Sequence, residues 1–269
     1  MKTILALLLT LFHAHAAESA WIEPMREVHA QFKGSPGTFA QFGDSITLTL
    51  AFWSPLQWKP KNMDAVALAA LERVSRTMNP DCWRAWKGAE FGSESGRTVG
   101  WAFDNVDKWL AKLNPEVAVV MFGSNDVRQM DVKEYEAKLR AVVEQCLKNG
   151  TVVILSTMPP RSEHVKKARE FAEVARKLAI ELHVPLSDYH AEIVKRRPND
   201  WDGSAGEFKA PGDVYDVPTL ISRDGVHPSA PKQFGGDFSA EALNAHGYNL
   251  RNYLTLLAYA EVIEKLGLK

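Results

Sequence analysis

The feature that most limits the possible folds is an unbroken apolar run, Val117-Ala118-Val119-Val120-Met121-Phe122, directly followed by Gly123-Ser124-Asn125-Asp126. Because apolar and polar residues do not alternate in this run, it indicates a strand buried on both faces, as in a parallel sheet. Open sheets of parallel strands bind ligands in the crevice beyond the carboxyl ends of their strands. Asn125 is therefore expected at the edge of a binding crevice.

Strand and helix patterns alternate along the rest of the chain, which predicts a parallel sheet with right-handed crossovers. The predicted strands span residues 38–42, 117–122, 152–157 and 184–186, and the predicted helices span 65–77, 102–113, 132–148, 163–182, 189–195 and 248–266. A chain of 269 residues that is 46% hydrophobic suits one domain with a sizeable core, here residues 17–269. The expected fold is a three-layer α/β/α arrangement around a mostly parallel sheet.

Two short motifs far apart in the sequence supply a nucleophile and its base. Gly43-Asp44-Ser45 follows the first predicted strand, and Asp224-Gly225-Val226-His227-Pro228 lies near the C-terminal end. A serine becomes a nucleophile only when a base takes its proton, and the base is usually a histidine oriented by a carboxylate. Each motif alone is equally typical of an ordinary turn. Together they predict a serine hydrolase with Ser45 as nucleophile, His227 as base and Asp224 as its orienting acid.

Two further positions offer donors for a developing oxyanion. The Asn125 side-chain amide can donate to such an oxygen, although this segment could equally cap the next helix. Gly96, in a loop, would let a backbone N–H approach a substrate closely, although by itself it is an ordinary loop glycine. Gly92 is a rival for the same role.

The four motifs, in this order, resemble those of the SGNH hydrolases, the GDSL esterase and lipase superfamily. The resemblance runs from Thr38 onward and implies a flavodoxin-like fold, a Ser45–His227–Asp224 catalytic triad, and an oxyanion hole made by Ser45, Gly96 and Asn125. It implies no metal and no organic cofactor. Gly96 lies 51 residues beyond Ser45 (96 − 45), which is long for the family and predicts an insertion within residues 53–90.

The N-terminal residues have the pattern of an export signal. Lys2 precedes an apolar stretch over residues 4–12 and an Ala-x-Ala site, so residues 1–16 are predicted to be a signal peptide, with a buried N-terminal helix as the alternative. The mature protein is expected outside the cytoplasm, secreted or periplasmic, without a stable membrane anchor. A net charge of −1 suggests no nucleic-acid partner. Cys82 and Cys146 are expected to remain unpaired.

The substrate is indicated less directly, by aromatic residues. Trp53, Trp58 and Trp201 are the candidates for stacking on a sugar ring, although a core role is the alternative for most tryptophans. The segments 53–62, 198–220 and 229–245 are expected to gather at the mouth of the Ser45 pocket. The predicted activity is removal of O-acetyl groups from a carbohydrate, small or polymeric. A lysophospholipase or lipase, an acyltransferase, and a non-catalytic carbohydrate-binding relative remain the alternatives.

Overall fold

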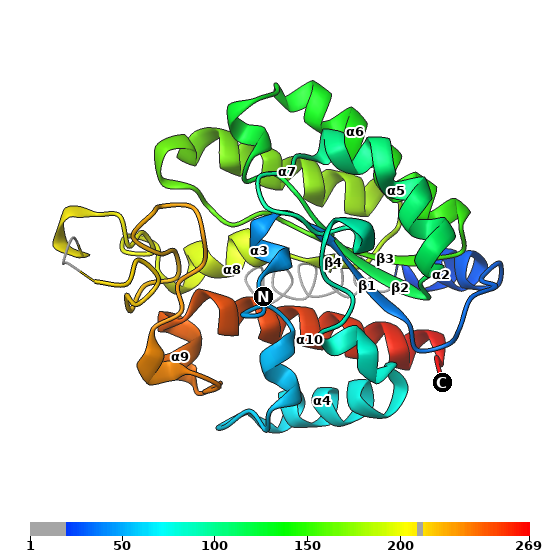
Figure 1. Ribbon diagram of the computed structural model, residues 1–269, viewed down its shortest axis with the longest axis horizontal. Helices are drawn as coiled ribbons and strands as arrows, with labels where there is room; N and C mark the ends of the chain where they lie inside the picture. The colour runs from blue at the N-terminus through cyan, green and yellow to red at the C-terminus, as the bar shows by residue number, and fades with distance from the viewer. Residues whose placement is uncertain (1–19, 209–211) are drawn as a thin grey trace, which may run out of the picture.

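The computed structural model describes residues 20–208 and 212–269, and its centre is a sheet of parallel strands in the order β1-β2-β3-β4 (Figure 1). The strands are β1 (Phe39–Gly43), β2 (Val117–Met121), β3 (Val152–Ser156) and β4 (Leu186–Ser187). Phe39 pairs with Val117, and Val117 pairs in turn with Val152. Every residue of β1, β2 and β3 is buried, as the unbroken apolar run predicts.

Helices cover both faces of this sheet. On one face lie α5 (Val99–Leu113), α6 (Val132–Lys148) and α7 (Val165–Glu181), which are above the strands in Figure 1. On the other face lies α10 (Gly247–Leu266), with α4 (Ala65–Thr77) packed against it and α2 (Ile22–His29) near one end. The remaining α-helices are α3 (Ser45–Leu48), α8 (Tyr189–Arg196) and α9 (Ala240–Ala245). This arrangement confirms the predicted three-layer α/β/α fold.

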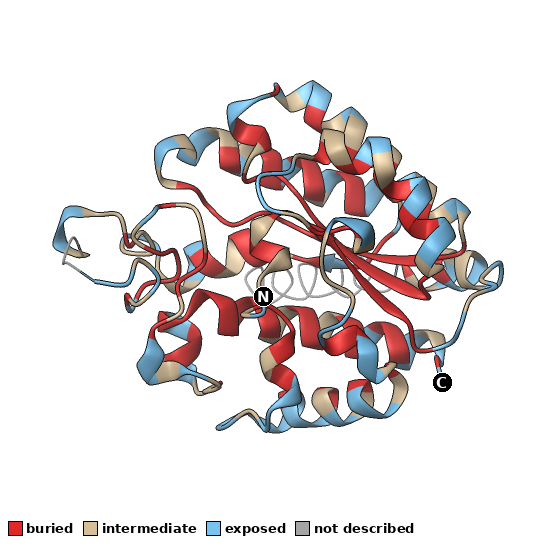
Figure 2. Cartoon of the chain, in the orientation of Figure 1, coloured by how far each residue is buried: buried red, intermediate tan, exposed pale blue. Residues whose placement is uncertain are grey.

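Short 3-10 turns lie in the connecting segments. They span Ser54–Gln57, Pro80–Trp83, Ala89–Phe91, Asp126–Arg128, Ser162–His164, Gly206–Phe208 and Lys232–Phe234. Burial is concentrated on the strands and on the sheet-facing sides of the helices, while the outer helix faces are exposed (Figure 2). In the described part of the chain, no helix has the length and apolar character needed to cross a membrane. The predicted signal peptide, residues 1–16, lies outside the described residues.

Local capping explains which element boundaries were predictable. Asp64 caps α4 by accepting a hydrogen bond from the Ala67 N–H, and Asp131 caps α6 in the same way, so both helices span the predicted residues. The end of α7 differs from the prediction. His183 adopts a left-handed conformation (φ 50°), and the Val184 N–H donates to the Ala179 carbonyl. Because that bond closes the helix end, β4 begins at Leu186 instead of Val184.

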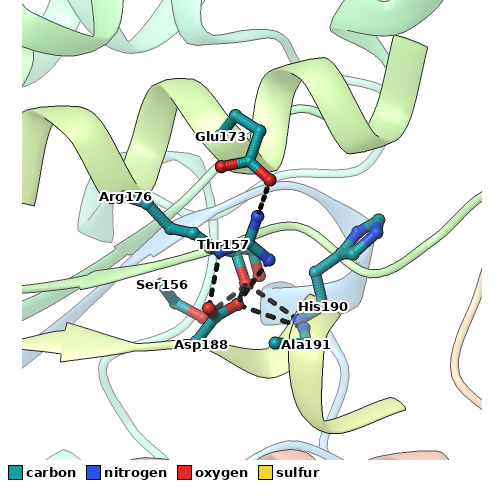
Figure 3. Close-up of polar contacts among 7 residues, drawn as sticks. All are labelled: Ser156, Thr157, Glu173, Arg176, Asp188, His190 and Ala191. Atoms are coloured by element: carbon teal, nitrogen blue, oxygen red, sulfur yellow. Dashed lines mark hydrogen bonds and ion pairs between the residues drawn. The ribbon is translucent and has the colours of Figure 1, made fainter. Parts of the chain in front are cut away.

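A polar cluster joins α7 to the segment that leads from β4 into α8 (Figure 3). The Arg176 guanidinium donates to both Asp188 carboxylate oxygens, at 2.6 and 3.0 Å, and the Thr157 hydroxyl donates to Asp188 at 3.0 Å. Asp188 also caps α8 by accepting from the Ala191 N–H. Burial raises the pKa of Asp188, but these hydrogen bonds and the Arg176 charge outweigh burial and hold that pKa below its ordinary value.

We expect Asp188→Asn to lower the free energy of unfolding by about 1.5–3 kcal/mol at pH 7, the usual contribution of hydrogen bonds to a charged group. A depressed pKa stabilises the fold above the ordinary carboxyl value and loses that effect as pH falls through the lowered folded value. The difference between the unaltered protein and the variant should therefore shrink below a pH of about 4. Urea unfolding at several pH values measures it. Glu173→Gln, which removes only the exposed partner of Arg176, is the matched control and should change little.

Candidate active site

Ser45 follows the carboxyl end of β1 by two residues, at the start of the short helix α3. Asp44 is fully buried and caps α3, accepting a hydrogen bond from the Ile46 N–H at 3.0 Å. Gly43 must lack a side chain, because a Cβ there would lie 2.1 Å from the Thr47 hydroxyl and 2.7 Å from the Met121 carbonyl. The tight turn therefore presents Ser45 at the edge of the sheet, where parallel sheets bind ligands.

The structure brings Ser45, His227 and Asp224 into one hydrogen-bonded chain. Ser45 Oγ lies 2.8 Å from His227 Nε2, and His227 Nδ1 lies 2.6 Å from an Asp224 carboxylate oxygen. The other Asp224 oxygen accepts from the Ser222 hydroxyl and from the Val226 and His227 N–H groups. Burial raises the pKa of Asp224, but these bonds outweigh it and hold the pKa well below the usual carboxyl range. Asp224 is thus an ionised acceptor, suited to orient an imidazole.

Asn125 lies four residues beyond β2, beside the Ser45 turn. Its side-chain Nδ2 donates to the Arg97 carbonyl at 2.9 Å and makes a longer contact of 3.4 Å with Asp44. One of its two N–H groups is therefore firmly held, and the other is weakly held. The alternative that this segment caps the next helix is wrong, because Asn125 makes no side-chain cap bond to the turn that follows it and Asp131 caps α6. Asp126 instead accepts from the Val99 N–H at the start of α5, which comes earlier in the chain.

Gly96, not Gly92, lines the cavity beside Ser45. The Gly92 carbonyl accepts from Gly43, and a Cβ at Gly92 would lie 2.3 Å from the Phe42 ring, so this glycine is required by packing against β1. A Cβ at Gly96 would meet nothing within 4 Å, but its positive φ of 75° favours glycine. Within the described residues, no acceptor is bonded to the backbone N–H of Ser45 or of Gly96.

Two buried carboxyl groups flank the nucleophile turn. Burial raises the pKa of Asp44 to about 6, against the lowering effects of the Ile46 N–H and of the Arg251 and His227 charges. Burial likewise raises the pKa of Asp126 to about 7, and the nearby Asp44 charge raises it further. Burial thus disfavours the charged form of both carboxyl groups.

One buried and one partly buried basic side chain hold the residues that follow Ser45. Arg251, from α10, is 1% exposed and donates to the Ile46 carbonyl at 2.6 Å and to the Thr47 hydroxyl at 2.8 Å. Lys87 Nζ donates to the Thr47 carbonyl at 2.5 Å. The Arg251 guanidinium also lies 3.6 Å from the centre of the Phe52 ring. Burial lowers the pKa of Arg251 to about 10. No local sequence pattern identified these two residues, because their partners lie far away in the chain.

A cavity of about 690 Å³ opens at Ser45. Its lining residues come from the Ser45 turn (Ser45, Leu48, Thr49 and Ala51), from the Gly96 loop and the segment after β2 (Ser95, Gly96 and Asn125), and from the C-terminal part of the chain (Asp213, Tyr215, His227, Ala230 and Tyr248). The segments 198–220 and 229–245 thus both reach the pocket, as predicted, whereas no residue of 53–62 lines it. Sequence reasoning missed Tyr215 and Tyr248, since a lone tyrosine in a loop or at a helix start carries no functional pattern.

The prediction that Trp53 is a surface residue available to substrate is wrong. Its side chain is 0% exposed and packs against the rings of Phe39, Trp83 and Tyr259 behind β1. Trp58 is exposed, and Trp201 is partly buried against the core, but neither lines the cavity. Burying the large aromatic surface of Trp53 in the core is more favourable in free energy than leaving it exposed to solvent. The cavity presents tyrosine rings where the sequence predicted tryptophans.

The cysteines do not line the cavity, and they bear on disulfide and metal chemistry. Cys82 and Cys146 are both buried free thiols, as expected. Within residues 20–208 and 212–269, no group of three or more His, Cys, Asp or Glu side chains could hold a metal ion.

The fold and the hydrogen-bonded serine, histidine and aspartate define the class of α/β serine hydrolases. A family model described as the GDSL-like lipase/acylhydrolase family matches residues 42–231. The chain belongs to this family, and the protein is a serine esterase that hydrolyses ester bonds. The family was predicted from the four motifs. A search of curated proteins finds no match.

Solved structures share the fold at low sequence identity. The lipase/acylhydrolase from Enterococcus faecalis is 17% identical, with a TM-score of 0.50, and the match covers 86% of this chain and 96% of that one. The psychrotrophic esterase EstA from Pseudoalteromonas sp., in a form inhibited by monoethylphosphonate, is 14% identical, with a TM-score of 0.51. That match covers 85% of this chain and 99% of EstA. At these identities the likeness supports the fold alone.

Proposed function

We propose that this esterase works through an acyl-enzyme on Ser45 and removes small acyl groups, above all acetyl, from a carbohydrate. The observation that carries the mechanism is the chain of contacts from Ser45 Oγ to His227 Nε2 at 2.8 Å and from His227 Nδ1 to Asp224 at 2.6 Å. Both distances are within the hydrogen-bond reach that general-base catalysis requires.

In the first half-reaction, Ser45 Oγ bonds to the acyl carbon while its proton passes to His227 Nε2. The tetrahedral oxyanion accepts hydrogen bonds from the Ser45 and Gly96 N–H groups and from the Asn125 amide. The ester C–O bond then breaks, and His227 gives its proton to the leaving alcohol oxygen. In the second half-reaction, a water molecule attacks the acyl carbon while His227 takes a proton from that water. The bond between the acyl carbon and Ser45 Oγ then breaks, and His227 returns the proton to Ser45 Oγ. The products are the alcohol and the carboxylic acid.

The walls of the cavity favour a sugar ester over a lipid. Asp213 is a charged acceptor, and Tyr215, whose ring meets the His227 ring edge-on, and Tyr248 offer rings with polar tips to the cavity. These polar groups can bond the hydroxyl groups of a sugar that forms the alcohol part of the ester. The alternatives of a lysophospholipase or lipase and of an acyltransferase use the same nucleophile, so the ester panel below separates them from the proposed activity.

A kinetic panel tests the proposed reaction. The purified protein should hydrolyse p-nitrophenyl acetate faster than the butyrate and far faster than the octanoate, and it should release acetate from acetylated xylan. A fluorophosphonate reagent should add one adduct, located on Ser45 by peptide mass spectrometry. Preference for octanoate would favour a lipase, and acetyl transfer to an added sugar would favour an acyltransferase. Absence of turnover and of an adduct would favour a non-catalytic carbohydrate-binding protein.

We also propose that the protein is exported. Support comes from the sequence of residues 1–16 alone: a lysine, an apolar stretch and an Ala-x-Ala site. N-terminal sequencing of protein from the native host tests this, since export with cleavage gives a start near Ala17 or Glu18, and an intact Met1 in the exported fraction contradicts it.

A further inference from the structure

The side of the cavity next to His227 has a defined chemical role in the proposed reaction, on which this inference rests. Because His227 Nε2 gives its proton to the leaving oxygen, the alcohol part of the ester must lie on the histidine's side. The Tyr215 ring meets the His227 ring edge-on, with 5.9 Å between centroids and an interplanar angle of 79°. Tyr215 therefore borders the space that the leaving alcohol occupies.

The loop that carries Tyr215 is held firmly in place. The Tyr215 N–H donates to an Asp213 carboxylate oxygen at 3.1 Å, and its carbonyl accepts from the Ala230 N–H at 2.8 Å. The Arg223 guanidinium donates to the Asp213 carbonyl at 2.6 Å. A wall fixed before substrate arrives binds with less loss of conformational entropy. The Tyr215 side chain keeps enough exposure, 36% for the residue, to offer its ring to a ligand.

Tyr248 adds a hydrogen-bond donor to the same cavity. It lies at the start of α10, is 4% exposed and lines the cavity. Its hydroxyl is not among the fully buried side-chain atoms that lack a partner, so it can bond a ligand group in the cavity.

Asp213 adds an acceptor. One of its carboxylate oxygens accepts from the Tyr215 N–H, and the other forms an ion pair with Lys232 Nζ at 3.6 Å, a distance too long for a hydrogen bond. Asp213 is also the one carboxylate among the cavity-lining residues, and neither lysine nor arginine lines the cavity as the described residues define it. An alcohol that bears a phosphate or carboxylate would be repelled by the Asp213 carboxylate, and no lysine or arginine among the described lining residues would attract it.

We propose that Tyr215, Tyr248 and Asp213 form the leaving-alcohol subsite and that it takes a neutral, polyhydroxylated alcohol such as a sugar ring. The ring stacks on Tyr215, one hydroxyl accepts from the Tyr248 hydroxyl, and another donates to Asp213. These residues select the alcohol and take no part in the proton transfers.

The test compares two acetyl esters. The ethyl group of ethyl acetate has no hydroxyl and no sugar ring for the subsite to bind, so this ester reports mainly on the catalytic residues, whereas an acetylated xylo-oligosaccharide reports on the subsite as well. Tyr215→Ala should lower kcat/KM for the oligosaccharide about tenfold or more, mainly through KM, and lower that for ethyl acetate by a clearly smaller factor, because the ring also packs edge-on against His227. Tyr215→Phe should retain most of the oligosaccharide activity, since the ring remains.

Three further variants sharpen the test. Tyr248→Phe removes only a hydroxyl and should lower oligosaccharide kcat/KM by about five- to tenfold. Tyr253→Ala is the control, because Tyr253 lies on α10 but does not line the cavity. It should leave kcat/KM unchanged for both esters. Asp213→Asn should reduce the preference of the enzyme for methyl 4-acetoxybenzoate over anionic 4-acetoxybenzoate. Equal losses on ethyl acetate and the oligosaccharide in both tyrosine variants would overturn the subsite. Failure of the unaltered protein to hydrolyse either ester would instead contradict the proposed function.

Discussion

Ser45→Ala should reduce kcat by about a million-fold, the loss seen when a serine hydrolase loses its nucleophile. Ser45 Oγ is the atom that hydrogen-bonds His227 Nε2, so alanine removes the nucleophile and leaves the base without this partner. The fold should be unaffected, because the Asp44 cap that holds α3 accepts from the Ile46 backbone and does not involve the serine hydroxyl. Acetate release under single-turnover and steady-state conditions measures the loss.

Ser95→Ala is the matched control, since Ser95 also lines the cavity, whereas the two His227 ring nitrogens bond Ser45 and Asp224. It should keep at least about a tenth of the activity, and its labelling by a fluorophosphonate should remain on Ser45. Activity of Ser45→Ala within a hundredfold of the unaltered enzyme would mean that a different group, or water activated directly by His227, begins the reaction. That result would reject the acyl-enzyme proposal while leaving family membership intact.

Asn125→Ala should lower kcat by about 100- to 1000-fold, as expected for the loss of one oxyanion donor. The more weakly held N–H of Asn125, 3.4 Å from Asp44, is the one that can turn to a substrate oxygen while the other stays bonded to Arg97. KM for ethyl acetate should change little, because the donor contacts charge that develops only in the transition state.

Stability must be measured beside activity, because Asn125 also bonds the Arg97 carbonyl. Asn105→Ala provides the control: its amide donates to the Trp101 carbonyl at the same 2.9 Å, on α5 and outside the cavity wall. The two variants should unfold at similar urea concentrations, and only Asn125→Ala should lose turnover. If both lose activity in proportion to stability, Asn125 has a structural role and the oxyanion assignment is wrong.

Much of the fold was predictable because its signals are local. The apolar run that forms β2 is buried on both faces wherever it packs, and the aspartates that begin α4 and α6 cap their own helices. The placement of the Ser45, Asn125 and His227 motifs at one edge of the sheet was predictable for the same reason. Each follows a strand or a turn signal within a few residues, and parallel strands bring their carboxyl ends to one edge.

The sequence by itself determined the sheet, the family and the residues of the Ser45–His227–Asp224 chain, since each depends on short-range pattern and strand order. Only the tertiary structure decided that Trp53 lies in the core, that Arg251 holds the Ser45 turn from more than 200 residues away, and that Tyr215 stands beside His227. These outcomes depend on which long-range contacts bury the most apolar surface and satisfy the most buried polar groups. Such contacts form only when distant segments of the chain fold together, so they cannot be predicted from any short segment of the sequence.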